Sequence, residues 1–168
     1  MTQTAMAEMK GDREIVVSRR FDAPRELVWR AWTDPIAIAE WWGPRGFDAP
    51  PCSIDLRPGG RFQIDLNGPD GKIYPCKGTF REIVEPERIV YDGPANEPAG
   101  CGAGIPPDAT VTITFDEENA GTKLTIHTLL ASEQHRQAAR TEGFIEGWQQ
   151  SLNRLAEAIE DGAIKTND

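Results

Sequence analysis

The C-terminal part of the chain carries the feature that most limits its possible folds, an amphipathic helix predicted from Ser132 to about Ile159. Within it, five apolar residues recur at intervals of three or four, the spacing that places side chains on one face of an α-helix: Phe144, Trp148, Leu152, Leu155 and Ile159. Such a face has to be buried against another element. Gly143 and Gly147 lie beside it, and because glycine is unfavourable within a helix, we expect them to allow close backbone approach or to leave open space.

The sequence before this helix consists mainly of short runs in which apolar and polar residues alternate, separated by turn-forming residues. The first strand is predicted at Glu14–Phe21. Two short helices follow, beginning at Pro24 and Pro35, because proline is favourable in the first turn of a helix, and the second ends near Gly43. Antiparallel strands are then predicted at residues 52–56, 61–66, 72–84, 88–91, 110–115 and 122–127. This order predicts an α+β fold in which a sheet wraps around the C-terminal helix.

The domain organisation follows from length and patterning. A chain of 168 residues suits one domain, which we expect to span residues 13–162. Residues 1–12 are polar and unpatterned, so they are predicted to form a disordered leader, and residues 163–168 a disordered tail. The segment from Asp92 to Ala109 is rich in Gly and Pro and has no periodicity, which predicts a long surface loop.

The charge of the chain restricts its partners. A formal net charge of −9 argues against nucleic acid, whose phosphates would require a basic surface, and against an anionic membrane. No run approaches the roughly twenty apolar residues of a membrane span, and the N-terminal residues lack the basic start and apolar centre of a signal peptide. We therefore expect a cytoplasmic protein whose partners are small molecules or proteins, with no nucleic-acid or membrane partner.

Residues that usually carry chemistry form no recognisable set. Cys52, Cys76 and Cys101 are an odd number without a CxxC pair, so we predict reduced thiols and no zinc site. His127 and His135 are predicted to be solvated structural histidines. No Ser-His-Asp or Cys-His set has supporting spacing, and no Gly-rich phosphate loop follows a strand. We therefore predict no catalytic residue, no metal and no cofactor.

Five stretches of the sequence have a recognisable composition: FDAPRELVWRAWTDP at 21–35, WWGP at 41–44, DLRPGGRF at 55–62, GTFREI at 78–83 and GW at 147–148. Together they closely resemble the bacterial members of the activator of heat-shock protein 90 ATPase homologue-like family, within the START-like (SRPBCC) superfamily. The resemblance runs from about residue 13 to 160. It implies a helix-grip fold, with an antiparallel sheet curved around the C-terminal helix, a cavity between them, and two short helices that help to close it.

The resemblance and the patterning together identify candidate cavity residues. Five tryptophans suit either an aromatic-lined pocket or a packed core. Trp29 and Trp32 are predicted to be core, whereas the resemblance places three other tryptophans around the cavity, and five strand residues share the parity of the apolar face. With two apolar residues of the last helix, the predicted ligand-binding set is Trp41, Trp42, Phe62, Ile64, Phe80, Val111, Ile113, Phe144, Trp148 and Leu152.

These observations predict a cytosolic binding module that holds a hydrophobic or amphipathic small molecule between the sheet and the last helix, without covalent catalysis. One alternative is an enzyme of the cyclase, hydrolase or isomerase kind that uses the same cavity, which a carboxylate or histidine in the cavity would favour. The other is a stress-related, co-chaperone-like module that binds a protein, which a contiguous exposed apolar patch would favour. Whether the chain is a monomer or a homodimer stays open.

Overall fold

The computed structural model describes residues 6–43, 45–49, 52–93, 108–141 and 144–164. Within these residues the strands are β1 Met6–Lys10, β2 Glu14–Phe21, β3 Ser53–Ile54, β4 Arg61–Asn67, β5 Ile73–Val84, β6 Arg88–Asp92, β7 Thr110–Glu118 and β8 Gly121–Leu129. The helices are α1 Arg25–Thr33, α2 Pro35–Ala39, α3 Glu133–Thr141 and α4 Phe144–Glu160. None of the helices in these ranges is long and apolar enough to cross a membrane.

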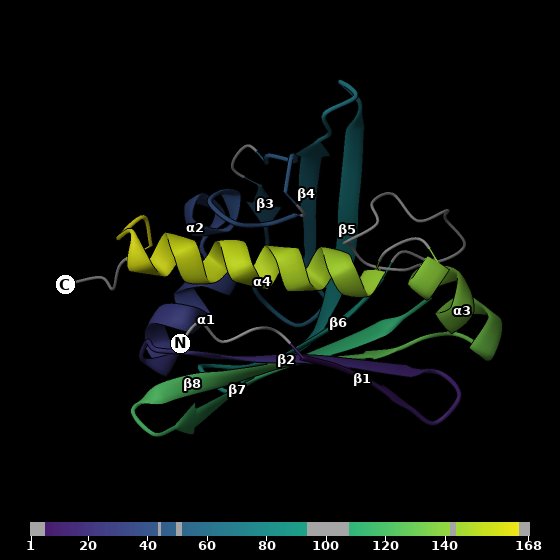
Figure 1. The fold of residues 1–168 in the computed structure, drawn as a ribbon, viewed down its shortest axis with the longest axis horizontal. Coiled ribbons are helices and arrows are strands. Elements are labelled where there is room, and N and C mark those ends of the chain that lie inside the picture. Colours follow the sequence, from purple (N-terminus) through teal and green to yellow (C-terminus); the bar gives the residue numbers. More distant parts are fainter. Residues whose placement is uncertain (1–5, 44, 50–51, 94–107, 142–143, 165–168) are drawn as a thin grey trace.

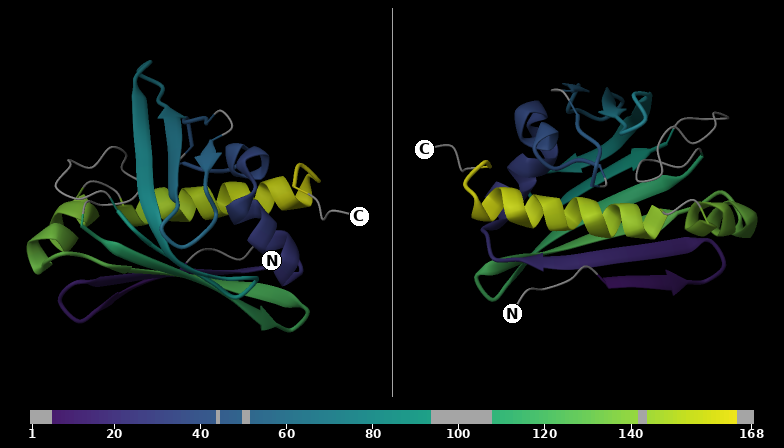
Figure 2. Two further views of the ribbon diagram at one scale, coloured as in Figure 1. Left: turned by 180° about the vertical axis from the view of Figure 1, so that it is seen from behind. Right: turned by 45° about the horizontal axis from the view of Figure 1, so that its top comes forward.

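The strands form one antiparallel sheet in the order β1-β2-β8-β7-β6-β5-β4-β3. Figure 1 shows that this sheet is strongly curved, with β1, β2, β7 and β8 below α4 and β3 to β5 rising beside it. Helix α4 lies across the concave face, as both views of Figure 2 also show. The predicted α+β class and helix-grip arrangement are therefore confirmed.

The core lies between the sheet and α4 because both present apolar side chains at the expected period. In β2 alternate residues are buried, and the same alternation is seen in β4 and β7. On α4, Trp148, Leu152 and Leu155 are at most 1% exposed. Apolar residues recur at every second position of the strands and at every third or fourth position of α4. Each element therefore has one apolar surface, and the two surfaces pack face to face.

One charged side chain, Arg19, occupies an inward-facing position of β2 and is only 8% exposed. Its Nη1 donates to the carbonyl oxygen of Leu152 at 3.1 Å and to Oδ1 of Asn153 at 2.8 Å. Burial lowers the pKa of Arg19 below its ordinary value because the charged form loses hydration, an effect that Glu160 and Glu157 oppose. The arginine joins β2 to α4 through hydrogen bonds.

The two short helices form where the sequence predicts, but α1 begins one residue later than expected, at Arg25, and α2 ends at Ala39 rather than near Gly43. Helix α1 ends at Thr33 because Asp34 precedes a proline and takes an extended conformation, with φ −92° and ψ 120°. The Asp34 carboxylate then accepts a hydrogen bond from the backbone nitrogen of Ile36 at 2.9 Å and caps α2, whose first residue is Pro35. The chain leaves α2 through Trp41, Trp42 and Gly43.

The C-terminal segment forms two helices, so the prediction of one continuous helix from Ser132 to Ile159 is wrong. Figure 1 shows α3 pointing in a different direction from α4. Among the described residues of α3 only Ala139 is buried, so this helix has no apolar face to hold it along the sheet. Gly143, which we expected within the helix, lies outside the described residues.

The predicted leader and tail are also partly structured. Met6–Lys10 form β1, which pairs with β2 from Met6 opposite Ser18 to Lys10 opposite Glu14. This segment, MAEMK, has no alternation of apolar and polar residues along its whole length, and its pairing partner is the otherwise open edge of β2. At the other end, Ile164 is 3% exposed. Of the predicted surface loop, residues 94–107 lie outside the described residues.

The cysteines differ from the prediction of three reduced thiols. Cys76 is disulfide-bonded. Cys52 is free, and Cys101 lies outside the described residues. Because disulfides are uncommon in reducing compartments, the bond at Cys76 weighs against the predicted cytoplasmic location.

Cys52 is expected to react slowly with thiol reagents at neutral pH. Burial raises the pKa of this thiol from its ordinary value of 9.0 to about 11, because the thiolate loses hydration. Alkylating reagents attack the thiolate, whose population near pH 7 should be about 100-fold lower than that of an ordinary cysteine. Labelling with iodoacetamide, followed by mass spectrometry, should accelerate up to pH 11, and a rate that levels off near pH 9 would contradict the burial of Cys52.

Candidate functional site

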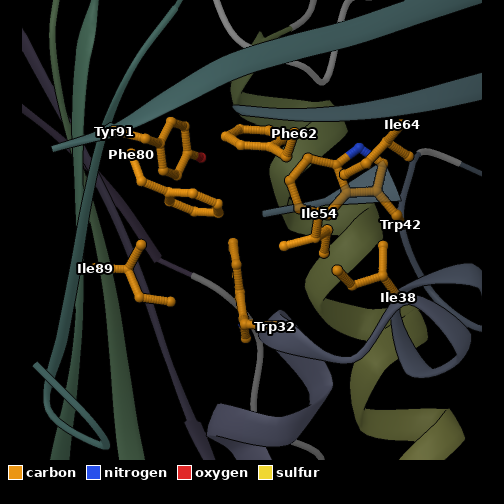
Figure 3. Close-up of a pocket in the computed structure, with 9 residues that line it drawn as sticks. All are labelled: Trp32, Ile38, Trp42, Ile54, Phe62, Ile64, Phe80, Ile89 and Tyr91. Carbon is orange, nitrogen blue, oxygen red and sulfur yellow. The ribbon is translucent and has the colours of Figure 1, made fainter. Parts of the chain in front are cut away.

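A cavity lies between the helices α1 and α2 and the strands β3 to β6 (Figure 3). Its lining side chains are Trp32, Ile38, Trp42, Ile54, Phe62, Ile64, Phe80, Ile89 and Tyr91. The cavity volume is about 20 Å³, counted as the space open to the centre of a water-sized sphere. On that measure about 10–15 Å³ accommodates one water molecule. The cavity is therefore narrow, with room for about one water molecule.

The sheet side of the cavity is aromatic because three neighbouring strands each contribute a ring. The centroid of Phe62 in β4 lies 4.9 Å from that of Phe80 in β5 and 5.1 Å from that of Tyr91 in β6. Phe62 pairs in register with Gly78 of β5. A side chain at Gly78 would come within 2.5 Å of the Phe62 ring, so this glycine makes room for it.

The helical side of the cavity rests on a tryptophan cluster, formed by Trp32, Trp41, Trp42 and Trp148. Trp32 of α1 lies 4.9 Å from Trp41 and 5.6 Å from Trp42, measured between ring centroids. Trp148 of α4 stacks on Trp32 at 5.6 Å and meets Trp42 edge-on at 5.4 Å. In this way α4 supports the cavity wall from behind without lining it.

Hydrogen bonds fix the segment that carries Trp42 to α4. Arg154 donates from Nη1 to the carbonyl oxygens of Trp42 at 3.2 Å and of Gly43 at 2.9 Å. Two residues later, the backbone nitrogen of Arg45 donates to Oε1 of Gln150 at 3.0 Å, and its guanidinium pairs with Glu157. Because these bonds come from one face of α4, they fix the position of Trp42 in the cavity wall.

The structure brings four of the predicted cavity residues together: Trp42, Phe62, Ile64 and Phe80. The other six are buried in the core but do not line this cavity: Trp41, Val111, Ile113, Phe144, Trp148 and Leu152. Five of these six belong to β7 and α4, whereas Trp41 packs against Trp32 of α1 and Trp42. The cavity lies to one side, between α1, α2 and β3 to β6. The expectation of a cavity directly between α4 and the sheet therefore differs from the observed position.

Five lining residues were not in the predicted set: Trp32, Ile38, Ile54, Ile89 and Tyr91. Ile89 and Tyr91 alternate correctly along β6, so strand parity could have found them. Trp32 was predicted to be core, and it is also part of the cavity wall. Ile54 is an apolar position of the strand predicted at residues 52–56, so parity could have found it as well, although only Ser53–Ile54 form β3.

Three of the cavity-lining side chains carry a polar atom that is buried and has no hydrogen-bond partner among the described residues: Nε1 of Trp32, Nε1 of Trp42 and the hydroxyl of Tyr91. Two other buried tryptophans differ, since Trp41 donates to the carbonyl oxygen of Ala31 at 2.9 Å and Trp29 to Oε1 of Glu85 at 3.2 Å. Burial raises the pKa of Tyr91, so its hydroxyl keeps the proton at physiological pH. All three groups are therefore hydrogen-bond donors.

Among the described residues, no carboxylate, imidazole, thiol, amine or guanidinium group lines this cavity, and Tyr91 is its one ionisable side chain. Nε2 of His127 lies 2.6 Å from Oε1 of Glu14, with both side chains about one-third exposed, and Nδ1 of His135 lies 2.6 Å from Oγ of Ser132. Within the described ranges, no group of three or more His, Cys, Asp or Glu residues is arranged to hold a metal ion. The cavity offers apolar surface and hydrogen-bond donors rather than an acid or a base.

Comparisons with known proteins agree with this architecture. A family model described as activator of Hsp90 ATPase homolog 1-like protein matches residues 22–160. A crystal structure from Nitrosomonas europaea is 25% identical with a TM-score of 0.80, covering 92% of this chain and 99% of that one. One from Mycobacterium smegmatis is 26% identical with a TM-score of 0.79, covering 96% and 99%. One from Chromobacterium violaceum is 30% identical with a TM-score of 0.66, covering 89% and 99%. The comparison with curated proteins found no match.

Proposed function

The chain belongs to the family of activator of Hsp90 ATPase homolog 1-like proteins, and on that premise we propose that it binds a small hydrophobic or amphipathic molecule in the cavity between α1, α2 and β3 to β6. The observation that carries the proposal is the composition of the walls. Nine side chains from seven segments converge there, five of them aromatic and none charged. Concave sites with aromatic and aliphatic walls are typical of small-molecule binding.

The narrowness of the cavity implies that a wall moves when the ligand binds. A volume of about 20 Å³ is too small for a ring compound. Ile54 is the lining residue best placed to yield, since it is only partly buried and lies in the two-residue strand β3 at the edge of the sheet. Trp42, by contrast, is held to α4 by the hydrogen bonds of Arg154.

Binding without catalysis is the version of this function that the wall favours. The lining residues include no carboxylate and no imidazole, the groups that an enzyme of the cyclase or hydrolase kind would use as acid or base. The co-chaperone alternative has the family name in its favour. Large exposed apolar residues, such as Ile36 and Ile73, belong to different elements, and single residues of this kind need no partner to explain them. The cytoplasmic location expected from the sequence is kept as a proposal, with the disulfide at Cys76 as the observation against it.

A charge at Ile54 is expected to abolish binding while leaving the fold intact. We expect Ile54→Asp to weaken the binding of N-phenyl-1-naphthylamine, a neutral fluorescent compound, by about 10-fold or more, because the ligand would have to desolvate the carboxylate. Leu56→Asp is the matched control, since Leu56 is exposed and does not line the cavity. Native mass spectrometry of the freshly purified protein should show an added mass that is lost on denaturation. Equal affinities of both variants, with no added mass, would contradict the proposed function.

A further inference from the structure

We propose that the cavity selects neutral, flat molecules that carry a hydrogen-bond acceptor, such as a carbonyl group on a ring, and that the hydroxyl of Tyr91 and the indole N–H groups of Trp32 and Trp42 are its donors. This inference rests on the proposed function and specifies its ligand class.

Three of the side chains that line the cavity carry unpaired hydrogen-bond donors. Buried polar atoms in proteins nearly always have a partner, so an unpaired one requires an explanation. Eight buried side-chain polar atoms lack one among the described residues, and three of these belong to cavity-lining residues. Tyr91 is 3% exposed, Trp42 is 3% exposed and Trp32 is 6% exposed. Figure 3 shows the Tyr91 oxygen turned toward Phe62 and the Trp42 nitrogen beside Ile64, both among the lining residues.

The Tyr91 hydroxyl and the two indole N–H groups require a hydrogen-bond acceptor on the ligand. An indole N–H can only donate a hydrogen bond. A phenol can both donate and accept a hydrogen bond. The Tyr91 hydroxyl remains able to donate, because burial raises its pKa and the group keeps its proton. A hydrocarbon would leave all three donors unpaired, and a ligand with donors alone would leave both indoles unpaired. A carbonyl oxygen has two lone pairs, so a single ligand group can satisfy more than one of these donors.

The walls of the cavity favour a ligand that is uncharged and flat. None of the lining residues carries a charge, so a carboxylate would give up its hydration without gaining an opposite charge. The ring planes of Phe62 and Phe80 are inclined by only 37°, with centroids 4.9 Å apart. A flat ring system entering beside them would replace part of this packing with stacking contacts of the same kind.

A matched pair of small ketone and hydrocarbon tests the inference. 1-Indanone and indane share a skeleton and differ in one carbonyl group. We expect the wild-type protein to bind indanone on the order of 10-fold more tightly than indane, the usual effect of pairing a buried donor. Addition of indanone should also shift indole N–H resonances in the proton–nitrogen correlation spectrum, whereas indane should leave them nearly unchanged.

Tyr91→Phe removes one donor and keeps the ring, so its preference for indanone over indane should fall about 5-fold. Tyr74→Phe is the matched control: the Tyr74 hydroxyl pairs with Asp70 away from the cavity, and the preference should not change. Equal affinity of the wild type for the two compounds, or tighter binding of indane-1-carboxylate than of indanone, would overturn the inference and leave the proposed function standing. No binding of any of the three, with no co-purified mass, would overturn both.

Discussion

Replacing Trp148 with alanine is expected to lower the free energy of unfolding by about 3–5 kcal/mol, the usual cost of truncating a large buried aromatic side chain. The indole is 1% exposed. It stacks on Trp32 with the ring planes 23° apart and meets Trp42 edge-on. Through these contacts α4 supports α1 and the segment after α2, so alanine would leave a void where three parts of the chain meet.

Urea unfolding followed by circular dichroism measures this free energy. Ile145→Ala on the same helix is the control, because Ile145 is only partly buried and should cost about 1 kcal/mol. Equal losses for the two variants would show that the tryptophan cluster does not hold α4 in place. Trp148→Phe, which keeps a ring at this position, should recover part of the loss.

Gly60→Ala is expected to destabilise the fold by about 3 kcal/mol, through a clash that the backbone has to relieve. A Cβ atom at Gly60 would lie 2.0 Å from the carbonyl oxygen of Asp55. The carbonyl oxygen of Gly60 accepts a hydrogen bond from the backbone nitrogen of Phe80 at 2.8 Å, and the backbone nitrogen of Gly60 donates one to the carbonyl oxygen of Arg57 at 2.8 Å. A shift of Gly60 would therefore disturb the turn between β3 and β4 and its contact with β5.

Its neighbour Gly59 provides the comparison. Gly59 has φ +84° but nothing within 4 Å of its Cβ position, so alanine there is strained without a clash. Gly59→Ala should cost about 1–2 kcal/mol, the penalty of a left-handed conformation for a residue with a side chain. Urea unfolding of the two variants separates the two causes, and a larger loss at Gly59 than at Gly60 would contradict the clash.

The strands and short helices were predictable because their signals are local. The alternation of apolar residues places β2 at Glu14–Phe21, as predicted, and the sequence Asp34-Pro35 separates α1 from α2. Pro58-Gly59 is a favourable pair for the centre of a turn, and the positive φ of Gly59 agrees with this. Propensity and periodicity operate within a few residues, so one sequence is enough to recognise them.

The extent of the last helix and the pairing of the edge strand were not predictable in the same way. Residues of α3 have helix propensity, but they lack an apolar face that would keep them aligned with α4. Residues of β1 have no strand pattern and depend on hydrogen bonds to β2. In both cases the outcome depends on what a distant segment offers, and propensity contains no information about that.

The cavity shows the same limit most clearly. Sequence patterns alone establish which residues are buried, because burial follows from the period of the apolar residues, and all ten predicted cavity residues are indeed in the core. Only the tertiary structure decides which of them border a space, because about 20 Å³ depends on how rings from β4, β5, β6, α1 and the segment after α2 meet. Phe62 and Trp148 each lie on the apolar face of their element, yet Phe62 lines the cavity and Trp148 supports its wall from behind. The difference arises from packing between segments that are far apart in the chain. Because protein interiors are close-packed, a space of this size depends on small differences in how those side chains fit together.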